Sequence, residues 1–206
     1  MSPVLVVAAV PQELQDFKTN GRRGIERLIT GMGRRAGEAV RRRLLEGDVG
    51  LVVSTGFAGA TRPGFKAGDL VMASEVIHGS SGERRHPGAS FPELSGLAGR
   101  GPFLTVDRVL SDPNRKSDAG KQFGAIAVDL ESAAVAQAAD RAGVAWVALR
   151  AILDPMELPL RITSRAQALS CLAVPRRWSE FSAFLRAIRT ASRSLGKGLQ
   201  GLLEKK

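Results

Sequence analysis

The sequence has little of what disulfides, metal clusters and membrane spans require. Its 206 residues include one cysteine, Cys171, two histidines, His78 and His86, and no tyrosine. A single cysteine cannot form an intramolecular disulfide, and with two histidines it offers too few ligands for a Cys/His zinc site. The opening apolar run, Val4 to Val10, is too short for a membrane span and lacks the preceding basic residue of a signal peptide. These absences predict a cytoplasmic protein in a reducing compartment, without a metal site. No cofactor is expected, although phosphate is a possible co-substrate.

The composition predicts one compact domain with an uneven charge. Apolar residues make up 44% of the chain and charged residues 24%, which is enough for a single buried core. Of the formal net charge of +10, residues 176–206 carry +6, since eight Lys or Arg stand against Glu180 and Glu204; the other 175 residues carry only +4. A basic C-terminal segment favours an anionic partner, either nucleic acid or a phospholipid surface.

Short apolar runs alternate with helical patterns, which predicts an α/β fold: a three-layer αβα sandwich around a central mixed sheet. Strands are expected at residues 4–10, 28–30, 51–54, 70–77, 103–109, 125–128 and 144–149. Helices are expected from the Gly31–Gly33 turn to about residue 46 and over 130–142. Residues 55–60 read as a loop, and 78–101 as a long surface loop or a lid over a site.

The C-terminal segment predicts a basic amphipathic helix. Apolar residues recur at helical spacing from Trp178 onward, with interruptions expected at Gly196 and Gly198. We therefore divide the chain into a catalytic domain, 1–175, and a C-terminal helix, 176–206. The helix either packs on the sheet with its charges in solvent or attaches the protein to an anionic membrane surface.

Polar residues follow four predicted strands, where ligands gather in open α/β sheets. They are Glu13, the turn Gly31–Arg34, Asp129 with Glu131, and Asp154. Each has a plain structural alternative, such as a carboxylate at a helix N-terminus or a residue that begins a turn. The two acids of residues 128–131 stand where a buried strand meets a buried helix, a costly place unless they are bonded.

These residues form a recognisable series of motifs. The sequence resembles the nucleoside phosphorylase and nucleosidase superfamily that includes the methylthioadenosine/S-adenosylhomocysteine nucleosidases. Five segments carry the resemblance in consistent order: Ala8–Glu13, Thr30–Gly33, Ser54–Gly59 with Gly68–Asp69, Val128–Ala134 and Leu149–Asp154. A closer resemblance is to the hopanoid-associated phosphorylases, through Val106–Arg108, Lys116, the run 125–154 and an ending with Pro175, Trp178 and an Arg-rich helix. The resemblance implies an enzyme that releases adenine from a purine nucleoside, adenosylhopane in the closer subgroup.

The resemblance also assigns roles to the candidate residues. Asp154 would protonate the purine at N7, Glu131 would accept hydrogen bonds from the ribose hydroxyls, and Glu13 would deprotonate an attacking water. Leu130 would cover the ribose. Phe57, where many nucleosidases have a small hydroxyl residue, and Val109 would contact the substrate, and Leu153 replaces the usual serine before the acid.

The nucleophile and the substrate stay open on these residues. Phosphate as co-substrate would use Gly31, Gly33 and Arg34, whose backbone N–H groups and guanidinium suit an anion. A carboxylate at Glu13 would repel phosphate and favours hydrolysis. The alternative substrate is methylthioadenosine or S-adenosylhomocysteine.

Two other function classes and three partners complete the expectations. A nucleic-acid-binding module is the non-enzymatic alternative; the low aromatic content, 5%, and the absence of an aromatic–basic motif speak against it. A catalytically silent interaction protein is another, which the changes at Phe57 and Leu153 allow. The expected partners are a small nucleoside, further copies in a homodimer or larger assembly, and an anionic membrane at its inner face through 178–206.

Overall fold

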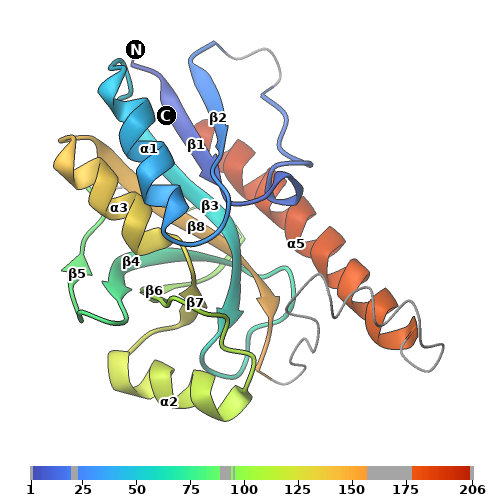
Figure 1. Cartoon of the computed structure of the whole chain (residues 1–206). Helices are drawn as coiled ribbons and strands as arrows, with labels where there is room; N and C mark the ends of the chain where they lie inside the picture. Colours follow the sequence, from blue (N-terminus) through green and yellow to red (C-terminus); the bar gives the residue numbers. More distant parts are fainter. Residues whose placement is uncertain (1, 20–22, 89–93, 95, 157–177, 205–206) are drawn as a thin grey trace.

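The computed structural model describes the chain except for residues 1, 20–22, 89–93, 95, 157–177 and 205–206 (Figure 1). The strands are β1 (Val4–Ala8), β2 (Ile25–Ile29), β3 (Leu51–Ala60), β4 (Leu70–His78), β5 (Arg84–Arg85), β6 (Leu97–Thr105), β7 (Ala127–Asp129) and β8 (Ala145–Asp154). The helices are the short 3₁₀ turn η1 (Pro11–Glu13), α1 (Arg35–Leu45), α2 (Pro113–Phe123), α3 (Ser132–Arg141) and α5 (Trp178–Glu204).

The eight strands form one mixed sheet that folds back on itself. Its order is β2-β1-β3-β7-β6-β4-β5, and β8 pairs with both β3 and β4. Strands β3, β8, β4, β6 and β7 therefore close a ring, in which β3–β8, β4–β6 and β6–β7 are parallel. The β3–β7 and β4–β8 pairs are antiparallel. This mixed sheet between helices confirms the predicted α/β fold class.

Strand β1 is buried on both faces, which explains its uninterrupted apolar sequence. Leu5 and Val7 belong to the core cluster that contains α1 and α3. Val4 and Val6 belong to a second cluster that contains Leu199 of α5. Helices α1 and α3 accordingly lie side by side on one face of the sheet and α5 on the other, while α2 lies at one end (Figure 1).

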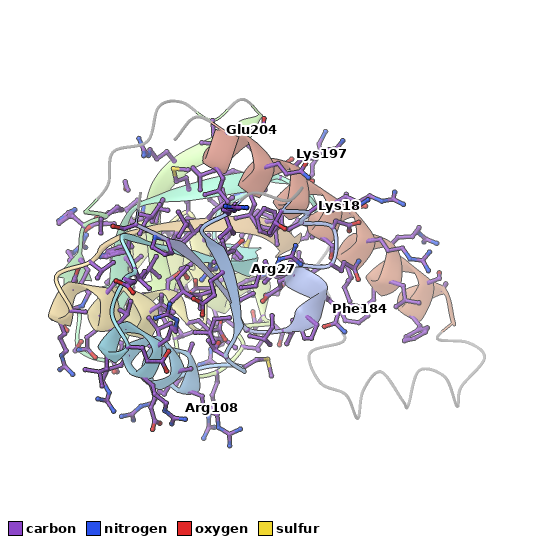
Figure 2. All side chains as sticks on the ribbon, turned by 90° about the horizontal axis from the view of Figure 1, so that it is seen from above. Lys18, Arg27, Arg108, Phe184, Lys197 and Glu204 are labelled. Atoms are coloured by element: carbon purple, nitrogen blue, oxygen red, sulfur yellow. The ribbon has the colours of Figure 1, made fainter. Side chains whose placement is uncertain are left out.

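The C-terminal half of α5 is part of the core. Ala191, Leu195 and Leu199 are fully buried, whereas none of residues 181–190 is buried. The N-terminal end of α5, near Phe184, projects past the sheet (Figures 1 and 2). Ser192 of the buried half donates a hydrogen bond of 2.8 Å to the carbonyl of Gln12. Helix α5 thus holds in place the 3₁₀ turn that carries Glu13.

The expected interruption of this helix at Gly196 and Gly198 is wrong, because α5 is continuous from Trp178 to Glu204. A Cβ on Gly196 would lie 2.5 Å from the carbonyl oxygen of Asp16, and one on Gly198 would lie 2.8 Å from Leu70 Cδ1. The two glycines allow close approach of the helix to its neighbours. They do not break it.

Other predicted boundaries also need correction. Residues 55–60, expected as a loop, continue strand β3, because Thr55, Gly56 and Phe57 pair in register with β8. The strand expected at 103–109 is β6, which begins at Leu97 and ends at Thr105. Part of the expected lid over 78–101 is strand, namely β5 and the start of β6; residues 89–93 and 95 lie outside the described part of the chain. Helix α2 was not expected, although Asp112 and Pro113 form an ordinary N-terminal cap and first turn.

Candidate active site

Glu13 is a buried carboxylate directly after β1. Pro11 begins η1, and this turn directs the Glu13 side chain back toward the backbone of Ala9 and Val10. Its Oε2 accepts hydrogen bonds from the N–H groups of Ala9 (2.7 Å) and Val10 (3.1 Å), and its Oε1 accepts one from Phe57 N–H (3.0 Å). Burial raises the pKa of Glu13, and the three donors and the charge of Arg150 offset this only in part.

The position of Glu13 depends on a glycine in β3. Gly56 has a φ of +155°, and a Cβ there would lie 2.7 Å from Glu13 Oε1. A larger residue would displace the carboxylate from the strand. The Gly56 backbone therefore makes room for an acid at the centre of the sheet.

Glu131 stands between β7 and α3 and has fewer partners. Its Oε1 accepts a hydrogen bond of 2.8 Å from Gly33 N–H, which is its sole hydrogen bond to the described residues. Burial, followed by the charge of Asp129, raises the pKa of Glu131 to about 7, against the opposing effects of Gly33 N–H and Arg150. A carboxyl group that titrates near neutral pH is typical of functional sites.

Asp129, two residues earlier, is enclosed in a complete polar network. Its Oδ2 accepts a hydrogen bond of 2.9 Å from Arg150 Nε and another from Ser132 Oγ, and its Oδ1 accepts one of 2.8 Å from Thr105 Oγ1. Arg150 also donates to Ser54 Oγ (3.0 Å) and Ser132 Oγ (2.8 Å). Both side chains of the ion pair are 1% exposed. The network joins β3, β6, β7, β8 and α3 below the site.

Asp154 ends β8 and forms an ion pair with Lys116 of α2. Lys116 Nζ lies 2.8 Å from Asp154 Oδ2 and 3.3 Å from the Asp154 carbonyl oxygen. The Lys116 side chain is fully buried, while that of Asp154 is 14% exposed. Asp154 pairs in the sheet with Gly59, two residues along β3 from Phe57, the donor to Glu13.

The three predicted carboxylates thus lie along one region of the sheet. Phe57, whose N–H group donates to Glu13, and Gly59, which pairs with Asp154, are about 7 Å apart along β3. Glu13 and Glu131 are close enough that the charge of Glu13 contributes to the raised pKa of Glu131. Glu131 and Asp154 follow Glu13 by 118 and 141 residues in the sequence. The fold brings all three to strand ends in this region of the sheet.

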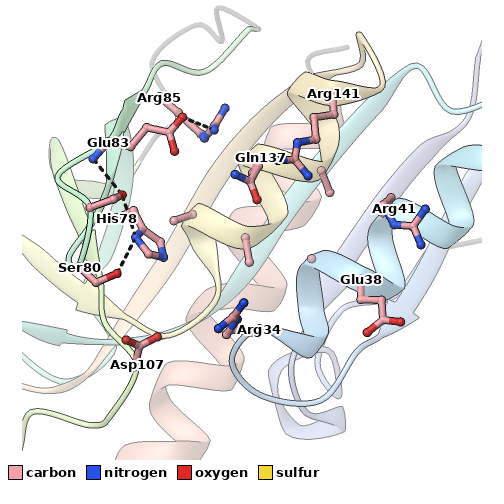
Figure 3. A pocket seen from close by; sticks show the side chains of 15 residues that line it. Arg34, Glu38, Arg41, His78, Ser80, Glu83, Arg85, Asp107, Gln137 and Arg141 are labelled. Carbon is pink, nitrogen blue, oxygen red and sulfur yellow. Dashed lines mark hydrogen bonds and ion pairs between the residues drawn. The ribbon is translucent and has the colours of Figure 1, made fainter.

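The Gly31–Arg34 turn contacts the site in a way that bears on phosphate. Gly31 N–H donates to the Ala9 carbonyl (3.1 Å) and Gly33 N–H to Glu131, so both N–H groups are engaged by the protein. Gly33 has a φ of +72°, which favours glycine and aims its N–H at Glu131. Arg34 is exposed and lines both cavities next to this turn (Figure 3).

Two adjoining cavities lie near the Gly33–Glu131 hydrogen bond, and Glu13, Glu131 and Asp154 do not line either of them. The inner one, about 180 Å³, is lined by the predicted ribose-covering residue Leu130 and by Gly33, Thr105 and Val106. The outer one, about 540 Å³, shares Arg34, His78 and Asp107 with it (Figure 3). Its remaining lining is mostly polar, including Glu38, Arg41, Arg85, Gln137 and Arg141.

Phe57 and Val109 are the two remaining predicted substrate contacts, and the Phe57 N–H group donates to Glu13. Phe57 packs against Leu70, Ala151 and Leu195, in the core beneath α5. Val109 is 50% exposed and lines neither cavity. In the described residues no group of three or more His, Cys, Asp or Glu could hold a metal ion.

Sequence reasoning assigned no role to Arg150 and gave Lys116 none beyond resemblance. Both are fully buried cations, and each sits opposite an acid at a strand end. A signal for Arg150 was present, since a charged residue within the apolar run 144–153 requires a buried counter-charge. Lys116 gave no such signal, because α2 reads as a polar surface helix.

Solved structures similar to this chain are nucleosidases. The 5′-methylthioadenosine/S-adenosylhomocysteine nucleosidase of Helicobacter pylori matches with a TM-score of 0.75 at 17% identity, over 100% of this chain and 99% of that one. The Neisseria meningitidis nucleosidase, solved with methylthio-immucillin-A, matches with a TM-score of 0.74 at 19% identity, over the full length of both chains. At these identities the likeness establishes the fold.

Sequence comparison gives relatives of the same kind. A 5′-methylthioadenosine/S-adenosylhomocysteine nucleosidase of Geobacillus kaustophilus is 29% identical in an alignment 129 positions long, which covers 50% of this chain and 54% of that protein. One from Anoxybacillus flavithermus is 27% identical in an alignment 130 positions long, which covers 50% of this chain and 56% of that protein. The chain thus aligns with about half the length of these curated relatives. A family model described as the phosphorylase superfamily matches residues 24–172, most of the chain, and the protein therefore belongs to the phosphorylase superfamily.

Proposed function

We propose that this protein cleaves the N-glycosidic bond of a purine nucleoside and releases adenine. The observation that carries the proposal is the grouping of three buried or partly buried carboxylates: Glu13 and Asp154 both contact β3, and Glu131 lies close enough to Glu13 to feel its charge. Gly33, which bonds Glu131, and Leu130 line a nearby cavity. Breaking this bond builds positive charge on the ribose and negative charge on the base. Carboxylates near the sugar and an acid near the base both lower that barrier.

Each carboxylate has surroundings that suit its proposed part. Glu13 has a raised pKa, as a base for water needs, and its bonds to three N–H groups fix its direction. Glu131 keeps one oxygen without a donor among the described residues, which leaves it able to accept hydrogen bonds from ribose hydroxyls. Asp154 would act at the purine, as the acid that protonates it.

Water is the nucleophile we favour over phosphate, and no cofactor is required. The N–H groups of Gly31 and Gly33 already donate to Ala9 and Glu131, so neither is available to cradle an anion without rearrangement. The carboxylate of Glu13 adds repulsion. Phosphorolysis would use Arg34 from the cavity side.

The 5′ substituent has two candidates, supported by different regions. Adenosylhopane, suggested by the hopanoid-associated resemblance, has an apolar substituent that the protein would meet at the inner face of the membrane. Methylthioadenosine or S-adenosylhomocysteine suits the charged outer cavity, with Arg34 and Arg41, better than a polycyclic hydrocarbon does. The curated relatives also carry that name.

The test is adenine release by the purified full chain from these three nucleosides, with and without phosphate. We expect release that does not depend on phosphate and that falls about 10²- to 10⁴-fold in Asp154→Asn. Equal rates in Asp154→Asn and the unmodified protein, or release from none of the nucleosides, would remove the proposal. Phosphate-dependent release, with ribose 1-phosphate as product, would reverse the choice of nucleophile.

We propose that the projecting half of α5 attaches the protein to an anionic membrane. Arg186 and Arg189 are exposed there, as is Leu185 at 38%. No helix in the described part of the chain is long and apolar enough to cross a bilayer. The Arg186→Gln/Arg189→Gln variant should sediment less with anionic vesicles, at about 1 kcal/mol per charge. Sedimentation equal to that of the unmodified chain would contradict this attachment.

The proposed homodimer is a separate expectation, and analytical ultracentrifugation of the full chain would test it.

A further inference from the structure

The buried cation Lys116 stands behind the proposed acid. Its side chain is 0% exposed, and its Nζ lies 2.8 Å from Asp154 Oδ2, a distance typical of an ammonium donating to a carboxylate. In the described chain Asp154 is its sole ion-pair partner. A lysine removed from water in this way needs that counter-charge.

This geometry changes what Asp154 can do alone. A carboxylate that pairs with an ammonium carries no proton, and a general acid must carry one. The Lys116–Asp154 pair as a whole does hold one transferable proton, on Nζ. The pair lies at the end of β8, where Asp154 is 14% exposed and Lys116 is enclosed. Solvent and substrate therefore reach the pair through Asp154.

We propose that Lys116 is the positioning residue and proton reserve of the site, acting through Asp154; the inference rests on the proposed function. As the C1′–N9 bond breaks, its electron pair passes to the purine. A proton moves from Lys116 Nζ to Asp154 and from Asp154 to N7, which leaves a neutral amine beside a carboxylate. The attacking water bonds to C1′ and gives a proton to Glu13. Solvent then reprotonates Lys116 as Glu13 releases its proton.

The packing of α2 supports this assignment. Gly120, one turn after Lys116, approaches β3 so closely that a Cβ would lie 2.6 Å from the Thr61 carbonyl oxygen. Asp112 caps the helix by accepting from the N–H groups of Asn114 and Arg115. The helix is thus fixed against the strand that also carries Gly59, and it directs Lys116 inward.

The experiment compares two leaving groups in three variants. The nucleoside that the unmodified protein cleaves is assayed beside its N7-methylated form, whose base departs without needing a proton, with spontaneous cleavage subtracted. Lys116→Met removes the proton reserve. Lys116→Arg keeps a positive charge but cannot give up its proton. Lys121→Met, an exposed lysine on the same helix, is the matched control.

For Lys116→Met and Lys116→Arg we expect kcat on the ordinary nucleoside to fall about 10²-fold, with less than a threefold change on the methylated one. Lys121→Met should match the unmodified protein. Thermal melting checks that each variant is folded.

The outcomes separate the inference from the proposed function. Equal losses on both nucleosides, or full activity in Lys116→Arg, would show that Lys116 only supports the structure and would overturn the inference. Cleavage of neither nucleoside by the unmodified protein would overturn the proposed function itself. If Lys116→Met and Lys116→Arg still cleave the methylated nucleoside but cleave the ordinary one poorly, the result supports the inference and the proposed function.

Discussion

Asp129 and Glu131 are two acids of one short motif, and the structure treats them in opposite ways. Asp129 is surrounded by Arg150, Ser132 and Thr105, and its side chain is 1% exposed. Glu131 has one hydrogen bond within the described part of the chain, from Gly33, and a pKa raised to about 7. The buried charge with a full set of partners stabilises the fold. The buried charge with a deficit of partners is left able to bind and to titrate.

The origin of the difference is the strand-to-helix junction. Asp129 is the last residue of β7 and faces into the sheet, where Arg150 of β8 reaches it. Glu131 precedes α3 and turns toward the glycine turn after β2. Asp129, which faces into the ring of strands, and Glu131, which faces away from it, are therefore only two residues apart in the sequence.

The largest expected effect is on the enclosed acid. Asp129→Asn leaves Arg150 buried without its counter-charge, which should lower the free energy of unfolding by about 3–5 kcal/mol. Urea denaturation of the full chain measures it. A loss below 1 kcal/mol would mean that the two acids are not different in kind.

The same change of charge at Glu131 should spare the fold and reduce activity. In Glu131→Gln the amide oxygen can still accept from Gly33 N–H, so the urea midpoint should change little. Loss of the carboxylate near the ribose should lower the rate of adenine release about 10²-fold or more. Full activity in this variant would remove Glu131 from the site.

Stability against pH provides a test that does not depend on substrate. Because the folded-state pKa of Glu131 is raised to about 7 from its ordinary value of 4.5, between these two pH values the folded protein holds a proton that the unfolded chain has released. The contribution of Glu131 is therefore fully present below pH 4.5 and is lost as pH rises through 7. Unfolding free energies measured from pH 4.5 to 8 should fall more steeply for the unmodified protein than for Glu131→Gln. Parallel curves would contradict the raised pKa.

The smallest expected effect concerns a partner that the enclosed acid can lose. Ser132→Ala removes one hydroxyl that bonds both Asp129 and Arg150, while Thr105 and the direct ion pair remain. We expect a loss of about 1 kcal/mol in urea denaturation and unchanged adenine release. A large drop in activity with normal stability would show that the network tunes Glu131 as well.

Much of the fold follows from patterns that lie within short segments. The continuous apolar run of β1 predicted a strand buried on both faces, and the Gly31–Gly33 turn predicted the start of the helix that is now α1. The extension of β3 through residues 55–60 did not follow from sequence. Gly56 and Gly59 look like loop residues until the pairing with β8 and the space needed by Glu13 are known.

The sequence by itself determined the fold class, the order of the strands and helices other than β5 and α2, and which carboxylates are candidates, because apolar periodicity and motif order are local properties of the chain. Only the tertiary structure decided which acid is enclosed by Arg150, which one titrates near neutral pH, and which one Lys116 faces. The physical reason is that desolvation and charge pairing depend on groups brought together from distant strands. No short segment of the sequence specifies the distances between these groups.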